Sequence, residues 1–305
     1  MVFGTCFTRF MFIAEPTFSA VSGQLICRWR TAPFVRLTTG AWRRIFTRDA
    51  LNGVLPGPGI SPISRAFALR EHWLLQMKRC FDPAVLEMMD RPQPVSPELE
   101  RDLERLRQLN RWFGSHRLVL SFMRRWIKPG ARTRVVDLAT GSGDIPRLIV
   151  DYAREIGARL EIDALDRQPA TFEVARRLST GYPEISYHEA NILEWNSAEI
   201  YDIALCSLTL HHFGDEDAVR VLRRCRELSR RFVLVSDLRR GPLLKGGVYL
   251  LTALIFREPM TRFDARLSAA RAFTFSEMRD LAVHADWQNF GHKKFRFARQ
   301  AIWLE

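Results

Sequence analysis

The feature that most constrains the fold is an apolar run that ends in a glycine-rich turn, residues 135–144, VVDLATGSGD. Residues 134–138 predict a buried parallel strand, and residues 145–156 carry apolar side chains at helical spacing. Gly141 and Gly143 therefore fall in a strand-to-helix turn. Without side chains there, a ligand can approach the main chain closely.

A second predicted strand, residues 160–165, ends at Asp166. This acid lies about 20 residues after the turn, where dinucleotide-type folds place a carboxylate that binds ribose. The turn lacks the third glycine of GxGxxG, Pro146 begins the helix, and Asp137 lies inside the strand. Proline is well tolerated at a helix start. The pattern predicts a nucleoside ligand in a site unlike that of NAD.

Strands and helices continue to alternate after these elements. Residues 201–213 give a fourth strand that ends in Leu-His-His-Phe, and residues 215–230 predict an acid-capped amphipathic helix. A fifth strand covers residues 232–236. Two runs of alternating apolar residues, 289–297 and 300–304, predict a closing antiparallel hairpin. Such alternation predicts a parallel sheet with right-handed crossovers.

Residues 137–143 resemble motif I of the class I S-adenosylmethionine-dependent methyltransferases, with Ala139 in place of the first glycine. Residues 187–192, YHEANI, follow a third strand, and Asn191 stands where the family has an aspartate near the adenine amine. Leu-His-His-Phe at 210–213 is similar to a signature of small-molecule methyltransferases, including the ubiquinone and menaquinone biosynthesis type. The order of residues after the fifth strand resembles that of phenolic lipid and polyketide pathway enzymes.

The resemblance covers residues 131–305. It implies an α/β fold with a Rossmann-like, seven-stranded, mostly parallel sheet and a C-terminal antiparallel hairpin. It also implies S-adenosylmethionine as the cofactor and no metal. By position, the cofactor contacts fall to eight residues: Asp137, Ala139, Gly141, Gly143, Asp166, Asn191, Ile192 and Ser207.

Methyl transfer is an in-line displacement, and a hydroxyl acceptor must also lose its proton. His211 and His212 follow the fourth strand, beside the expected methyl position, and histidine titrates near neutral pH. Adjacent residues of a strand point to opposite sides, so we expect only one of the pair to face the acceptor. We assign His211 as the base.

The chain is predicted to have five parts. Residues 1–76 hold nine arginines against three acids and form a basic extension, either disordered or translated from a mis-assigned start. The other parts are a helical cap with helices at 97–110 and 115–127, the cofactor-binding core, a lid insertion, and a C-terminal helix with the hairpin: 77–130, 131–239, 240–273 and 274–305.

The net charge of +12 raises the question of nucleic acid, but 41 of the 46 basic residues are arginine, as a GC-rich coding sequence would also give. The fourth strand lacks the tetrapeptide of DNA amino-methylases, and Cys206 lacks the context of a base-carbon nucleophile. We therefore expect a small hydrophobic substrate, methylated on oxygen or carbon. A protein or nucleic-acid methyltransferase and a non-catalytic cofactor-binding assembly protein stay as alternatives.

Five cysteines without a metal-type or paired spacing predict a cytoplasmic protein. The apolar run 243–256 is shorter than a membrane-spanning helix, so we expect it to pack as a lid, with peripheral membrane contact as the alternative. The sequence leaves the oligomeric state open.

Overall fold

The computed structural model describes residues 14–21, 24–31, 78–197, 200–256 and 258–305. The chain divides into two compact units, residues 1–75 and 76–305. In the first unit, β1 (Ala14–Val21) and β2 (Gln24–Thr31) pair as an antiparallel hairpin. The remainder of residues 1–76 lies outside the described residues, so the prediction made for this extension stays a prediction.

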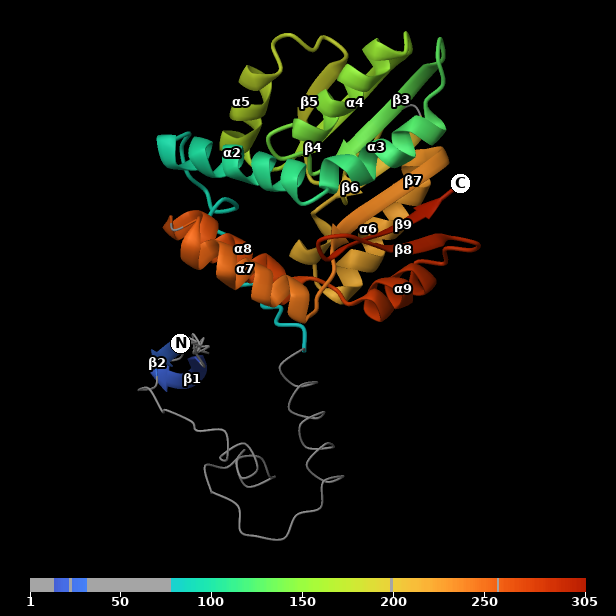
Figure 1. Ribbon diagram of the computed structural model, residues 1–305. Helices are drawn as coiled ribbons and strands as arrows, with labels where there is room; N and C mark the ends of the chain where they lie inside the picture. Colours follow the sequence, from blue (N-terminus) through green and yellow to red (C-terminus); the bar gives the residue numbers. More distant parts are fainter. Residues whose placement is uncertain (1–13, 22–23, 32–77, 198–199, 257) are drawn as a thin grey trace, which may run out of the picture. The chain divides into compact units, whose positions relative to one another are not determined.

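In the described part of the second unit, seven strands form one sheet in the order β5-β4-β3-β6-β7-β9-β8 (Figure 1). The first five strands in this order are parallel, and the last two are antiparallel. The predicted fold is therefore confirmed. The strands are β3 (Arg132–Leu138), β4 (Arg159–Asp166), β5 (Ile185–Glu189), β6 (Tyr201–Ser207), β7 (Ser229–Leu238), β8 (Gly291–Phe295) and β9 (Arg299–Leu304).

Helices cover both faces of this sheet, and alternate residues of each central strand supply the two cores. Val135 packs with α3 (Ser115–Trp126) and α4 (Asp144–Glu155). Val136, the next residue, packs with α6 (Asp215–Leu228) and α9 (Phe275–His284) on the other face. The central strands are consequently buried on both sides, which explains their continuous apolar sequence.

Four further helices complete the described part of the second unit. They are α2 (Pro97–Trp112), α5 (Pro169–Leu178), α7 (Pro242–Leu254) and α8 (Pro259–Arg271). Helix α2 begins as predicted, because the Ser96 side chain accepts a hydrogen bond from the Leu99 N–H and Pro97 occupies the first turn. The insertion after β7 holds two helices, α7 and α8, which pack side by side (Figure 1). Among the described residues, no helix is long and apolar enough to cross a membrane.

Candidate functional site

A cavity of about 980 Å³ opens where β3, β4 and β6 end. Parallel α/β sheets bind ligands outside the carboxyl ends of their strands, at the point where the connections that leave two adjacent strands run to opposite faces of the sheet. Helices α2, α7 and α8 contribute to its walls, together with residues 78–95, which we call the strap. Of the nine residues predicted for the site, eight line this cavity: Asp137, Ala139, Gly141, Asp166, Asn191, Ile192, Ser207 and His211.

The turn after β3 presents its backbone to the cavity. Ala139 has a φ of 61° and Gly141 a φ of 57°, both in the left-handed region that glycine adopts most easily. A Cβ on Gly141 would meet no atom within 4 Å, so the space beside this residue is open. The Gly141 N–H donates to Asp166 Oδ2 at 2.8 Å, which joins the turn to the acid at the end of β4.

Gly143 is the one predicted cofactor residue that does not line the cavity. Its φ is 72°, and a Cβ there would lie 2.1 Å from the Tyr187 hydroxyl oxygen. Tyr187 belongs to β5, whereas the sequence placed it after that strand, and its hydroxyl pairs with Ser179 Oγ at 2.7 Å. Glycine at 143 is therefore explained by backbone conformation and by Tyr187. We predicted that a ligand would approach the backbone at Gly143, but the cavity does not reach this residue.

Two buried acids lie at the ends of β3 and β4. Burial raises the pKa of Asp166, although the N–H groups of Gln168 and Gly141 donate to its carboxylate. Burial also raises the pKa of Asp137, to about 7, with added repulsion from Asp144 and Asp166. Both acids are destabilised as anions in the cofactor-free protein, so a positively charged group beside them would be favoured.

The remaining predicted cofactor residues have local partners. Asn191 Oδ1 accepts from the Leu193 N–H, and its Nδ2 donates to Glu194, so this side chain also shapes the turn after β5. Ile192 is buried and apolar. Ser207 Oγ pairs with Ser236 Oγ at 2.9 Å. All three residues line the cavity.

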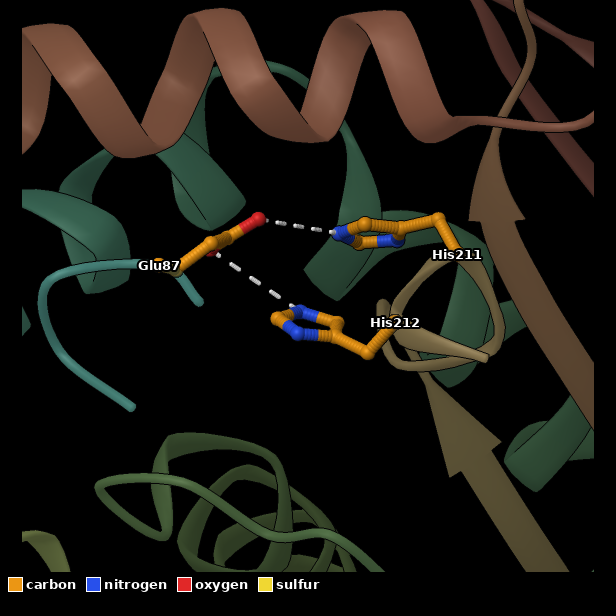
Figure 2. Close-up of side chains that lie close together, drawn as sticks. All are labelled: Glu87, His211 and His212. Atoms are coloured by element: carbon orange, nitrogen blue, oxygen red, sulfur yellow. Dashed lines mark ion pairs between the residues drawn. The ribbon is translucent and has the colours of Figure 1, made fainter. Parts of the chain in front are cut away.

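His211 and His212 lie in a short 3-10 helix, η3 (Leu210–His212), and both rings point toward Glu87 (Figure 2). The expectation that they face opposite sides is wrong, because residues of a 3-10 turn are spaced by a third of a turn and do not alternate as in a strand. His211 Nδ1 lies 2.7 Å from Asp237 Oδ1, and the His211 backbone N–H donates to Asp237 Oδ2 at 2.8 Å.

Burial alone would raise the pKa of Asp237, but the His211 ring and these hydrogen bonds hold it below its ordinary value. Asp237 is therefore a carboxylate that accepts a hydrogen bond from the Nδ1–H of His211, so in the neutral form of the ring the lone pair lies on Nε2. His211 is held in one tautomer and one orientation at the cavity wall.

The His212 ring also has acidic partners, which belong to the strap. Its Nδ1 lies 2.9 Å from Asp90 Oδ2, and its Nε2 lies 3.9 Å from Glu87 Oε2. Burial disfavours the imidazolium, but Glu87 and Asp90 outweigh this and raise the pKa of His212 to about 9. Glu87 is only 3% exposed and accepts a hydrogen bond from Ser268 Oγ at 2.6 Å.

The sequence did not indicate the strap. Its backbone N–H groups at Met88 and Met89 donate to Asp264 of α8, and Arg79 donates to the carbonyls of Phe213 and Arg271. These are all contacts between distant parts of the chain, and the strap has no helical or strand periodicity to reveal it. The one available signal was the pair of adjacent histidines, whose ring nitrogens need hydrogen-bond partners when they are buried.

Residues 135–231 match a family model described as a methyltransferase domain. The fold is similar to human N-acetylserotonin methyltransferase in complex with SAM, at 16% identity and a TM-score of 0.50 over 80% of this chain and 67% of that one. It is also similar to the plantazolicin methyltransferase in complex with a triazolic desmethyl analogue and SAH, at 13% identity and a TM-score of 0.51 over 69% and 92%.

A Nostoc punctiforme PCC 73102 protein assigned as an O-methyltransferase aligns at 16% identity and a TM-score of 0.48, over 69% of this chain. The chain spans 62% of the length of that protein. No curated protein matches the sequence. Residues 135–231 of this chain therefore carry a methyltransferase domain of the kind that uses S-adenosylmethionine.

Proposed function

We propose that this S-adenosylmethionine-dependent methyltransferase methylates a hydroxyl group on a small, largely apolar acceptor of phenolic, quinone or polyketide-like chemistry. The observation that carries the proposal is that the oriented His211 and the glycine turn after β3 line the same cavity. The cofactor and an acceptor can therefore meet in front of one basic nitrogen.

The cavity walls support an apolar acceptor. Helices α2 and α7 turn aliphatic side chains toward it, among them Leu103, Leu106, Leu244, Val248 and Leu251. Burying an apolar ligand against such walls contributes about 25 cal/mol per Å² of apolar surface. The described lining also carries eight carboxyl groups and four arginines, which disfavours the polyanionic backbone of a nucleic acid.

When bound, S-adenosylmethionine supplies a methyl group on a positively charged sulfur. The backbone at Gly141 and the carboxylate of Asp166 would hold its nucleoside end, and Asp137 would offer a negative charge to its cationic end. The cavity walls orient the acceptor, which supplies much of the rate of an in-line displacement. His211 Nε2 takes the hydroxyl proton, and Asp237 stabilises the resulting imidazolium through Nδ1.

The test replaces His211 with alanine and uses His284→Ala as the control, since His284 is exposed at the end of α9. Full-length proteins are incubated with labelled S-adenosylmethionine and a cell lipid extract, and labelled products are identified by mass spectrometry. We expect His211→Ala to bind S-adenosylhomocysteine normally but to lose about 10²–10⁴-fold in turnover, the usual contribution of a general base.

Normal turnover in His211→Ala would show that His211 is not the general base. Labelled RNA, DNA or protein in place of an extractable small molecule would overturn the assigned acceptor class.

A further inference from the structure

We infer that Glu87, His211 and His212 form a binding site for a divalent transition-metal ion. Their three ligand atoms, one carboxylate oxygen and two imidazole nitrogens, lie within 4.8 Å of one another. They come from two segments far apart in the sequence, the strap and η3, and converge on one point (Figure 2). The site goes beyond the proposed methyl transfer and does not depend on it.

The outer nitrogens of both rings are already occupied. His211 Nδ1 pairs with Asp237 and His212 Nδ1 pairs with Asp90, at 2.7 and 2.9 Å. Metal-binding histidines characteristically donate their second N–H to a carboxylate, which fixes the tautomer and turns the other nitrogen's lone pair toward the metal. Here both Nε2 atoms are directed in this way toward Glu87, whose own carboxylate is held by Ser268.

The distances leave room for an ion between the ligands. His211 Nε2 lies 4.0 Å from Glu87 Oε1, and His212 Nε2 lies 3.9 Å from Glu87 Oε2. Both distances exceed a hydrogen bond. Two bonds of about 2.0–2.2 Å each can span them through one ion, and a tetrahedral angle at that ion requires the ligand atoms to lie slightly closer together. A small inward movement of the Glu87 side chain would complete the coordination of one ion.

Charge at this point also favours a cation. Glu87, Asp90 and Asp237 are all buried or nearly so, and they surround only two imidazoles. Buried carboxylates need compensating cations, and a bound divalent ion, which would displace the proton that His212 carries at neutral pH, offsets two of these charges. The Arg79 guanidinium lies nearby, but it is engaged with the carbonyls of Phe213 and Arg271 and with Asp215.

The donor set indicates the class of metal. Imidazole nitrogen suits Zn²⁺, Co²⁺, Ni²⁺ and Fe²⁺, whereas Mg²⁺ and Ca²⁺ favour oxygen alone. Two histidines and one carboxylate are also the ligands of many catalytic sites that keep positions open. All three ligands line the cavity, so these positions would face the acceptor. An ion there would lower the pKa of a coordinated hydroxyl, so in the metal-loaded protein the ion would replace His211 Nε2 in activating the acceptor. The base role proposed above for His211 applies to the metal-free protein.

Metal binding tests the site directly, without cofactor or acceptor. Untagged full-length protein is treated with a chelator, dialysed and titrated with Co²⁺ by visible absorption and with Zn²⁺ by calorimetry. We expect one ion per chain and a visible band typical of four- or five-coordinate Co²⁺. Glu87→Gln and His212→Ala each change a metal ligand and should weaken binding by at least tenfold. Asp90→Asn removes the carboxylate that orients the His212 ring and should also weaken binding by about tenfold or more. His284→Ala and Glu104→Gln, which change exposed or peripheral groups, should bind as the wild type does.

The same samples are tested for S-adenosylhomocysteine binding and by circular dichroism, which shows whether each variant is folded. The inference is overturned if the wild type binds no Co²⁺ or Zn²⁺ at micromolar concentration, or if folded Glu87→Gln and His212→Ala bind as tightly as the controls. Because metal binding is measured without methyl transfer, and the turnover of His211→Ala is compared with that of the chelator-treated wild type, either proposal can fail while the other holds.

Discussion

Asp137 shows how a single residue can serve binding at the expense of stability. Its carboxyl group is fully buried at the end of β3, and its pKa in the folded protein is about 7, against an ordinary value of 3.8. Between these two pH values the folded protein holds a proton that the unfolded chain has released. The free energy of unfolding therefore falls as the pH rises from about 4 to 7.

Asp137→Asn removes this ionisation while keeping the size of the side chain. We expect the variant to melt at a higher temperature than the wild type, with a larger gain at pH 8 than at pH 5. Three pKa units correspond to about 4 kcal/mol as an upper order of magnitude. Calorimetric melting across this pH range measures the gain, and binding of S-adenosylmethionine at pH 7.5 should be weaker in the variant. A gain that does not depend on pH would contradict the assigned pKa.

Gly141 and Gly143 differ although they lie two residues apart in the same turn. Both have a positive φ, so alanine at either position is strained by roughly 1–2 kcal/mol. A Cβ at Gly143 also meets the Tyr187 hydroxyl, whereas a Cβ at Gly141 enters open space in the cavity. The two positions therefore separate stability from binding.

We expect Gly143→Ala to lower the free energy of unfolding by clearly more than Gly141→Ala, as measured by urea denaturation. Gly141→Ala should instead produce the larger loss of S-adenosylhomocysteine affinity. Adding Tyr187→Phe to Gly143→Ala removes the nearest clashing atom and should recover part of the stability. Equal destabilisation by both alanines, with no recovery in the double variant, would show that Tyr187 does not restrict this turn.

Among the elements, the strap is the part that local sequence could not reveal. The strands and helices of the core have local signals, such as Ser96 and Pro97 at the start of α2 or Thr274 and Glu277 at the start of α9. Glu87 is held at the site by contacts with η3 and α8, for which a single sequence carries no signal. The orientation of His212 was missed for a related reason, because a 3-10 turn of three residues has no periodicity to detect.

Arg79 fixes one end of the strap. Its guanidinium lies 3.7 Å from the centre of the Phe273 ring and donates to the Phe213 carbonyl directly after η3. We expect Arg79→Ala to increase cleavage of the strap in limited proteolysis and to lower turnover, with little change in S-adenosylhomocysteine affinity. Arg79→Lys should not restore turnover, since an ammonium lacks the planar fork. Arg101→Ala, which removes an exposed pair within α2, is the control and should behave as the wild type does.

For the whole molecule, the division between residues 75 and 76 makes a clear prediction. A chain that starts at Met77 keeps the strap and should retain the melting temperature and cofactor affinity of the full chain. A chain that starts at Met89 lacks Arg79 and Glu87, and we expect it to lose turnover. If the chain that starts at Met77 melts many degrees below the full chain, residues 1–76 contribute to the stability of the second unit.

The central claim is that S-adenosylmethionine binds where the turn after β3 meets Asp166. Calorimetric titration of S-adenosylhomocysteine into Asp166→Ala tests it most directly, with Glu161→Ala as the control because Glu161 is an exposed acid of the same strand. We predict that Asp166→Ala loses roughly 1.5–3 kcal/mol of binding free energy, as for a charge-assisted hydrogen bond, while Glu161→Ala binds normally. Unchanged affinity in a folded Asp166→Ala protein would contradict the account.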